Sequence, residues 1–229
     1  MINILLADDH GVVREGFANM LAEAGDIQLL ASVASGEEAV KQTRELRPDV
    51  VLMDVYMPGM GGLEAMRAIL KRCRQVRVIG LSAYTGDGYP VMFVRAGASG
   101  FIGKDCTVEE LHSAIRSVHN GDQHLPENLE PLAEESAPPD DNNPFTELSD
   151  RELQTALLVI DGYDNSAIAQ VLKIGDKTVK NYKFRLFEKL DIRSEVELVA
   201  LAIRHGIVDP QQVKVGRERP RNADDDSPR

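Results

Sequence analysis

Polar side chains stand where short apolar runs end in the first half of the chain. The runs are INILLADD, DVVLMD, VRVIGLS and GFIGK, and the polar residues that close or follow them are Asp8, Asp9, Asp54, Ser82 and Lys104. Continuous apolar runs are typical of buried parallel strands, and the functional groups of an open α/β sheet gather at the carboxyl ends of its strands. We therefore expect these five side chains to meet at one edge of one sheet.

The carboxylates of this series predict a metal site. Carboxylates that share one place repel each other and raise each other's pKa, and a bound divalent cation removes that conflict. Oxygen ligands without His or Cys suit Mg²⁺, which proteins hold with a few carboxylates, water and phosphate. Lys104 and Ser82 would offer a cation and a hydroxyl donor to an incoming anion. His10 follows the acidic pair, and we expect it to start a helix or lie in a loop beside the site rather than to bind metal.

Strand and helix signals alternate through this half of the chain. This alternation predicts a five-stranded, doubly wound parallel sheet with helices on both faces, an α/β fold. Ser35 stands before two glutamates and is a good helix cap. Gly59, Gly61 and Gly62 predict a sharp turn just after the strand that Asp54 closes. The expected helices cover residues 10–24, 36–46, 62–72, 86–96 and 107–120.

The ordered series of motifs resembles the receiver domain of response regulators over about residues 1–120. The matching segments are LLADDH, DVVLMDVYMPGMGGLEAMR, GLSA and AGASGFIGKD. The resemblance implies that Asp54 accepts a phosphoryl group. The metal ligands that it implies are Asp8, Asp9, Asp54 and the backbone carbonyl of Tyr56. The phosphoryl-contacting and switch residues that it implies are Ser82, Lys104 and Phe101.

From residue 145 the pattern changes to helices only. The segment SDRELQTALLVI begins with a capping box of Ser149 and Glu152. The segments NSAIAQVLKI and KTVKNYKFRLFEKL fit a helix-turn-helix, in which Val179 would anchor the second helix in the core. We expect Asp176 to cap that second helix. The second half is therefore predicted to be a small all-α domain.

A basic stripe on the second helix predicts contact with DNA. Residues 173–189 hold six basic and two acidic side chains, although the whole chain has a net charge of −11. A local basic stripe matters more for phosphate contact than the global charge. The expected contacts with phosphates and base edges of a major groove are Lys177, Thr178, Lys180, Asn181, Lys183 and Arg185.

This half resembles the tetrahelical LuxR-type domain of the NarL/FixJ family. The matching segments are LSDREL, AIAQVLKI, KTVKNY and FEKLDI. The segments NPFTELSDRELQTALLVI and VELVALAIRHGIVD narrow the likeness to the branch that includes GacA and UvrY. The resemblance implies a two-component transcription regulator that is phosphorylated by a sensor histidine kinase. It also implies binding to double-stranded promoter DNA, a homodimer on activation and contact with RNA polymerase.

Composition sets the expected boundaries and location. Residues 126–144 hold six acids and no base, which predicts an acidic, Pro-rich linker. We expect a receiver domain at 1–120, the linker at 121–144, a DNA-binding domain at 145–210 and a disordered tail at 211–229. No apolar run reaches the roughly 18 residues that a membrane helix needs, and no secretory signal is apparent. Cys73 and Cys106 suggest no disulfide framework, so we expect a cytoplasmic protein without a membrane partner.

Two other functions remain open from the residues. A Mg²⁺-dependent aspartyl-phosphate phosphatase also uses an Asp nucleophile at a strand end. Such enzymes usually carry a second acid two residues after the nucleophile, and Tyr56 holds that position here. A DNA binder that works without phosphorylation would tolerate a degenerate receiver, whereas Ser82, Lys104 and the acidic set are all present. We expect no enzymatic role.

Overall fold

The computed structural model describes residues 1–82, 93–94, 96–125, 143–205 and 207–208. Several predictions lie outside these residues. They are most of the expected helix at 86–96, most of the linker at 121–144, and the tail at 211–229. The domain boundaries therefore stay predictions.

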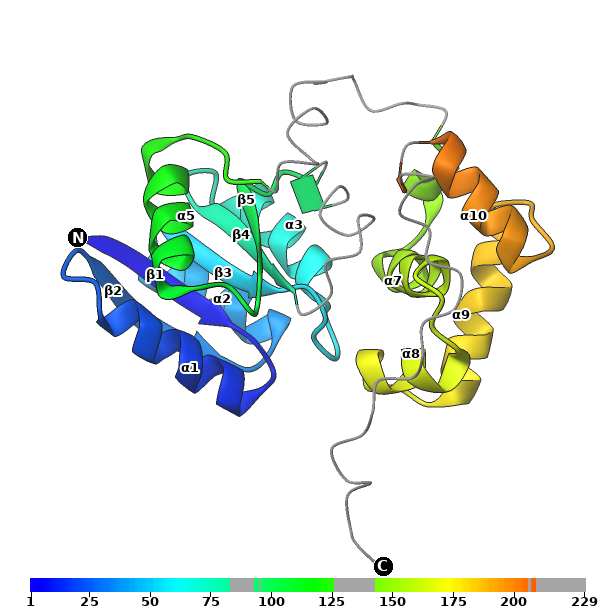
Figure 1. Ribbon diagram of the computed structural model, residues 1–229, viewed down its shortest axis with the longest axis horizontal. Coiled ribbons are helices and arrows are strands. Elements are labelled where there is room, and N and C mark those ends of the chain that lie inside the picture. The colour runs from blue at the N-terminus through cyan, green and yellow to red at the C-terminus, as the bar shows by residue number, and fades with distance from the viewer. Residues whose placement is uncertain (83–92, 95, 126–142, 206, 209–229) are drawn as a thin grey trace, which may run out of the picture.

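Five parallel strands form one sheet in the first half of the chain (Figure 1). The strand order is β2-β1-β3-β4-β5, and every neighbouring pair is parallel. The strands are β1 (Ile2–Ala7), β2 (Ile27–Val33), β3 (Val50–Asp54), β4 (Arg77–Ser82) and β5 (Gly100–Gly103). The chain order reverses between β1 and β3, and in open α/β sheets ligands bind outside the carboxyl ends of the strands at such a point.

Helices cover both faces of this sheet, as predicted. They are α1 (Gly11–Ala22), α2 (Gly36–Leu46), α3 (Gly62–Arg72) and α5 (Val108–Asn120). Side chains alternate across a strand, and β1 divides accordingly. Ile4 and Leu6 pack with α1 and α5, whereas Leu5 packs with α2 and α3. The predicted Ser35 cap is confirmed, because its side chain accepts a hydrogen bond from the backbone N–H of Glu38.

The second half is all helical. Its elements are the 3₁₀ turn η2 (Pro144–Glu147) and the helices α7 (Asp150–Ile160), α8 (Asn165–Leu172), α9 (Asp176–Lys189) and α10 (Glu195–Arg204). The capping box of Ser149 and Glu152 is confirmed, and Val179 is fully buried. No helix of the described chain is long and apolar enough to cross a membrane.

The predicted cap of α9 is wrong. The N-cap residue is Gly175, which has no side chain to cap the helix, and Asp176 lies inside the first turn. The Asp176 carboxylate instead accepts a hydrogen bond from the Ser166 hydroxyl at 3.3 Å. Its charge still favours the helix start because of the macrodipole.

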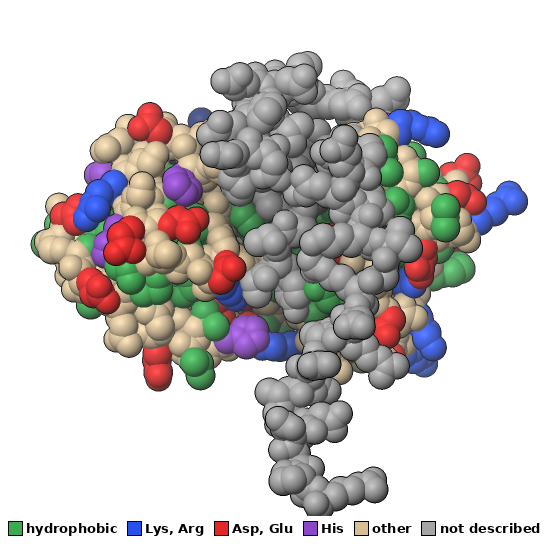
Figure 2. All heavy atoms as spheres, in the orientation of Figure 1, with side chains coloured by type: hydrophobic (Ala, Val, Ile, Leu, Met, Phe, Trp, Pro, Cys, Tyr) green, Lys and Arg blue, Asp and Glu red, His purple; other side chains and the backbone are tan. Residues whose placement is uncertain are grey.

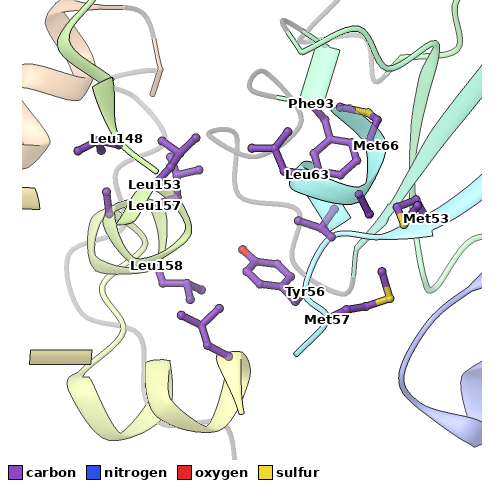
Figure 3. Packing of buried hydrophobic residues seen from close by; sticks show 14 of the residues in the cluster. Met53, Tyr56, Met57, Leu63, Met66, Phe93, Leu148, Leu153, Leu157 and Leu158 are labelled. Carbon is purple, nitrogen blue, oxygen red and sulfur yellow. The ribbon is translucent and has the colours of Figure 1, made fainter. Parts of the chain in front are cut away.

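The two halves share one hydrophobic cluster (Figure 3). The Tyr56 side chain points from the segment after β3 toward α7, where Leu157 and Leu158 lie opposite it. Tyr56 is 5% exposed and both leucines are buried. Burial of apolar surface stabilises by roughly 25 cal/mol per Å². The helix α7 is therefore packed against the end of the sheet where β3 stops.

Candidate functional site

The sheet brings the predicted carboxylates together. Strands β1 and β3 are neighbours, and Ala7 stands opposite Met53, so that the residues following both strands meet. Carboxylate oxygens of Asp8, Asp9 and Asp54 and a ring nitrogen of His10 all lie within 4.8 Å of one another. Asp8 and Asp54 are buried. Neighbouring carboxylates in a site shielded from water repel strongly, so this edge of the sheet favours cations.

Lys104 follows β5 and reaches into this cluster. Its Nζ lies 2.6 Å from Asp8 Oδ2 and 3.0 Å from Asp54 Oδ2. Burial opposes the ammonium charge, but Asp54 and Asp8 together raise the pKa of Lys104. The Lys104 ammonium is thus a counter-ion shared by Asp8 and Asp54.

The surroundings of the Asp54 carboxylate disfavour its charged form. Burial raises the pKa of Asp54 from 3.8 to about 6; Lys104 opposes this shift, and repulsion from Asp8 adds to it. For Lys104 the attraction of two anions outweighs burial, whereas for Asp54 burial and repulsion from Asp8 outweigh the attraction of one shared cation. The cluster therefore carries more negative charge than Lys104 neutralises.

The segment after β3 holds Asp54 in place. Asp54 Oδ1 accepts a hydrogen bond from the backbone N–H of Tyr56 at 3.1 Å, which places the Tyr56 backbone beside the carboxylate. A Cβ on Gly62 would lie 2.0 Å from the backbone oxygen of Asp54. Only glycine allows the first residue of α3 to approach so closely. The glycines of this turn are therefore part of the support of the site.

Ser82 and Phe101 lie on the neighbouring strands. Ser82 ends β4 opposite Gly103, and its backbone oxygen accepts a hydrogen bond from the backbone N–H of Lys104 at 2.8 Å. Phe101 is buried and meets the ring of Phe93 edge to face, with centroids 6.0 Å apart. A Cβ on Gly80 would stand 2.7 Å from the Phe101 ring. The ring pair fills space that this glycine leaves open.

The donor set fits a hard divalent cation. Asp8 Oδ2, Asp9 Oδ1 and Asp54 Oδ2 are buried and accept no hydrogen bond within the described part of the chain, although Lys104 lies close to two of them and the His10 ring to the third. Carboxylate oxygens of this kind suit Mg²⁺. His10 is the N-cap residue of α1, as expected, and its Nδ1 lies 2.9 Å from Asp9 Oδ1. It borders the cluster more closely than the sequence indicated.

Contacts from the helical half reach this site, and the sequence did not reveal them. Arg151 of α7 donates to the backbone oxygens of Met57 at 2.7 Å and Gly59 at 2.6 Å. Gln154, which is fully buried, donates to the backbone oxygen of Val55 at 3.3 Å. Lys173 forms an ion pair with Asp9. Arg67 of α3 pairs with Asp150 at 2.5 Å. The motifs that contain these residues do not indicate these contacts, because docking depends on how two folded units meet.

The helix α9 presents a polar face away from its core. Lys177, Lys180, Asn181 and Arg185 are exposed, and Thr178 is half-buried. Lys183 is different, because its Nζ donates a hydrogen bond to Asn165 Oδ1 at 3.0 Å and forms an ion pair with Glu195. Blue side chains lie along the outer edge of this half, with red ones among them (Figure 2). Among the predicted DNA contacts, Lys183 is thus the one already engaged within the domain.

An exposed aromatic residue on α9 was missed. Phe184 is 64% exposed. It lies three and four residues after Asn181 and Lys180, and therefore shares their side of the helix. The core positions of this helix are Val179 and Leu186, and Phe184 lies outside them.

Comparison with known proteins agrees with this arrangement. A family model described as the response regulator receiver domain matches residues 4–116, and one described as bacterial regulatory proteins of the luxR family matches residues 146–202. Response regulator GacA of Pseudomonas viridiflava is 44% identical over 211 residues, which cover 91% of this chain and 99% of that protein. Response regulator UvrY of Escherichia coli K12 is 40% identical, over 90% of this chain and 96% of that protein.

Solved structures show the same architecture. A two-component response regulator of the LuxR family from Aurantimonas is 32% identical, covers 58% of this chain and 95% of its own, and has a TM-score of 0.54. RcsB from Salmonella enterica serovar Typhimurium, solved bound to a promoter, is 20% identical with a TM-score of 0.56 and coverages of 87% and 97%, and it shows the fold alone. The chain therefore belongs to the two-component response regulators that join a receiver domain to a LuxR-type DNA-binding domain, a family of phosphorylation-gated transcription regulators.

Proposed function

We propose that Asp54 is the phosphoacceptor of this regulator and that Asp8, Asp9 and Asp54 hold Mg²⁺ together with the backbone carbonyl of Tyr56. The observation that carries the proposal is the meeting of three carboxylates with one shared lysine at the end of β3. A metal between them would neutralise the charge that Lys104 leaves over. The same Mg²⁺, when bound, would shield the oxygens of an incoming phosphoryl group.

The chain's own residues supply the rest of the transfer. A carboxylate oxygen of Asp54 forms the new P–O bond while the P–N bond to the kinase histidine breaks, and the electron pair of that bond stays on the imidazole nitrogen. Lys104, already 3.0 Å from Asp54 Oδ2, holds a phosphoryl oxygen as a charge-assisted donor. The Ser82 hydroxyl donates to a second oxygen.

Phosphorylation would be read through packing next to the site. A phosphoryl group on Asp54 draws Ser82 and Lys104 toward it, and Phe101 repacks beside Phe93. Such a local charge event can bias an element that has two states. The α7 contacts with the segment after β3 lie one to five residues from Asp54, so they are the part of the interface that this change would reach first.

The output is binding to promoter DNA through α9. Two copies would dimerise on activation and place their α9 helices in successive major grooves of a roughly palindromic site. Contact with RNA polymerase and a cytoplasmic location complete the proposal. The expected DNA contacts are Lys177, Thr178, Lys180, Asn181, Lys183 and Arg185. Lys183 would have to leave Glu195 to reach a phosphate.

The two alternative functions make different demands on the site. A phosphatase would need a general acid near Asp54, and the position two residues later carries the buried Tyr56, which faces α7. A phosphorylation-independent DNA binder would not need the buried cation that Lys104 provides. The closed acidic cluster therefore favours phosphotransfer over both.

The test is a phosphotransfer assay with a phosphorylated histidine kinase or a small phosphoryl donor, with and without Mg²⁺. The parent should take up acid-stable, base-labile label that depends on Mg²⁺, as an acyl phosphate does. Asp54→Asn should take up none, and the exposed Asp122→Asn should match the parent. Equal labelling of Asp54→Asn and the parent would refute the assignment. Release of free phosphate over many turnovers would favour the phosphatase.

A further inference from the structure

A lysine from the DNA-binding half lies at the receiver's acidic cluster. Lys173 is the C-cap residue of α8, in the turn of the helix-turn-helix, and it takes the left-handed conformation with φ of 51°. Its ammonium forms an ion pair with Asp9 Oδ2, 164 positions away in the chain. With the two halves packed together, the Asp9 side chain is only 6% exposed.

The charges of the cluster indicate a role for the ion pair between Lys173 and Asp9. Lys104 serves Asp8 and Asp54. Asp9 lies beyond that lysine, with His10 on one oxygen and Lys173 on the other. Lys173 is therefore the second ammonium of the cluster, and the only one that the DNA-binding half contributes within the described residues.

We propose that Lys173 is an internal counter-ion that competes with the divalent cation for Asp9. The proposal rests on the metal site proposed above. A carboxylate that neutralises an ammonium attracts a metal less, and two cations at one carboxylate repel each other. Metal binding would thus weaken the contact between the halves, and that contact would weaken metal binding by the same factor, because coupling between two binding events is reciprocal.

The neighbouring contacts place Lys173 at the site. Arg151 and Gln154 fix α7 on the backbone of the segment that follows β3. The turn after α8 then lies over the end of β1, where Asp9 stands. Loss of the α7 contacts should release Lys173 from Asp9 without any change in the cluster itself.

The test is a calorimetric titration of the full chain with Mg²⁺. Lys173→Gln should bind Mg²⁺ roughly 5-fold more tightly than the parent, at the lower end of common coupling factors. Lys173→Arg keeps the charge and should remain close to the parent. Lys71→Gln removes an exposed lysine of α3 and is the control. Arg151→Gln should tighten Mg²⁺ binding as well, and it carries the test if Lys173→Gln does not fold.

Small-angle scattering gives a second readout. Mg²⁺ should expand the parent, whereas Lys173→Gln should be expanded before Mg²⁺ is added. Equal Mg²⁺ affinity in the parent and in Lys173→Gln would overturn the counter-ion proposal and leave the metal site standing. Absence of Mg²⁺ binding in every variant would overturn both proposals.

A separate observation concerns Phe184. This side chain is the exposed aromatic of α9 and shares a face with Lys177, Lys180 and Asn181. The neighbouring cationic and amide side chains can bring this apolar ring to the edge of a base, where it would be removed from water. We infer that Phe184 packs against a thymine methyl group in the major groove, a contact that distinguishes thymine from the other bases. This inference rests on α9 as the DNA reader.

Replacement of single thymines by uracil removes only that methyl group. At one position of the DNA site, uracil should lower the affinity of the parent protein roughly fourfold, which is the equivalent of one buried methyl group. Phe184→Ala should be insensitive to the same replacement, and the exposed Val12→Ala of the receiver should behave like the parent. Equal uracil effects in the parent and in Phe184→Ala would overturn the contact. An unchanged salt dependence in Lys180→Ala would instead refute α9 as the reader.

Discussion

The acidic cluster and the polar face of α9 are built in opposite ways. The cluster is buried and collects side chains from the ends of β1, β3, β4 and β5. The face of α9 is exposed and comes from one helix. Charges shielded from water interact strongly, whereas exposed charges are screened by salt. The cluster should therefore respond to each substitution as a unit, and α9 should respond residue by residue.

Removal of the shared lysine should give the largest effect. Lys104→Ala leaves Asp8 and Asp54 buried without their cation, and the loss of one partner of a buried ion pair costs about 3–5 kcal/mol. Mg²⁺ should restore part of that stability, because it supplies the missing positive charge. Denaturant unfolding with and without Mg²⁺ measures both effects. The exposed Lys71→Ala is the control. A similarly small loss of stability in both variants would show that the cluster does not respond as a unit.

On α9 the largest single effect is expected at Asn181. Its exposed amide can read a base edge, so Asn181→Ala should change the relative affinity among sites by about 1–3 kcal/mol at one base pair. Binding to a panel of single-base variants measures this change. A uniform loss over the whole panel would place Asn181 on the backbone rather than on a base.

Two lysines of α9 differ in their contacts within the domain. Lys180 is exposed, whereas Lys183 is held by Asn165 and Glu195. Lys180→Ala should lower the slope of log affinity against log salt by about one unit. Lys183→Ala should lower it less and should also reduce the stability of the domain. Salt titrations of DNA binding by both variants measure the two slopes. A larger change in Lys183→Ala than in Lys180→Ala would show that Lys183 leaves Glu195 when the protein binds DNA.

The smallest effect is expected at a surface pair away from both sites. Arg116 donates two hydrogen bonds to Asp26, at 2.8 and 2.7 Å, and this bonding lowers the pKa of Asp26 from 3.8 to about 2. A carboxyl group with a lowered pKa in the folded state stabilises the folded protein above about pH 4. This stabilisation disappears as the pH falls toward 2. Asp26→Asn should thus lower the melting temperature slightly at pH 7 and not at pH 2. A difference that persists at pH 2 would assign the effect to packing.

The receiver was largely predictable because its chemistry lies at strand ends. Apolar runs indicated the strands, and the topology that follows from alternating strands and helices placed Asp54 beside Asp8 and Lys104. The contacts of Arg151, Gln154 and Lys173 could not be predicted in this way, since no period or spacing encodes how two folded units dock. The exposure of Phe184 was not predicted, because the residue type alone does not tell whether an aromatic side chain on a helix faces the solvent.

The way in which α7 holds the receiver has a consequence for sequence divergence. Arg151 and Gln154 bind backbone oxygens of the segment after β3, not side chains. The side chains of Met57 and its neighbours can therefore drift among related regulators without loss of these hydrogen bonds. Gly61 is the exception, because a Cβ there would lie 2.6 Å from the Gln154 amide nitrogen. In lineages that keep this docking, Gln154 and Gly61 should be inherited together, and exchange of the DNA-binding half between distant relatives should fail at this pair first.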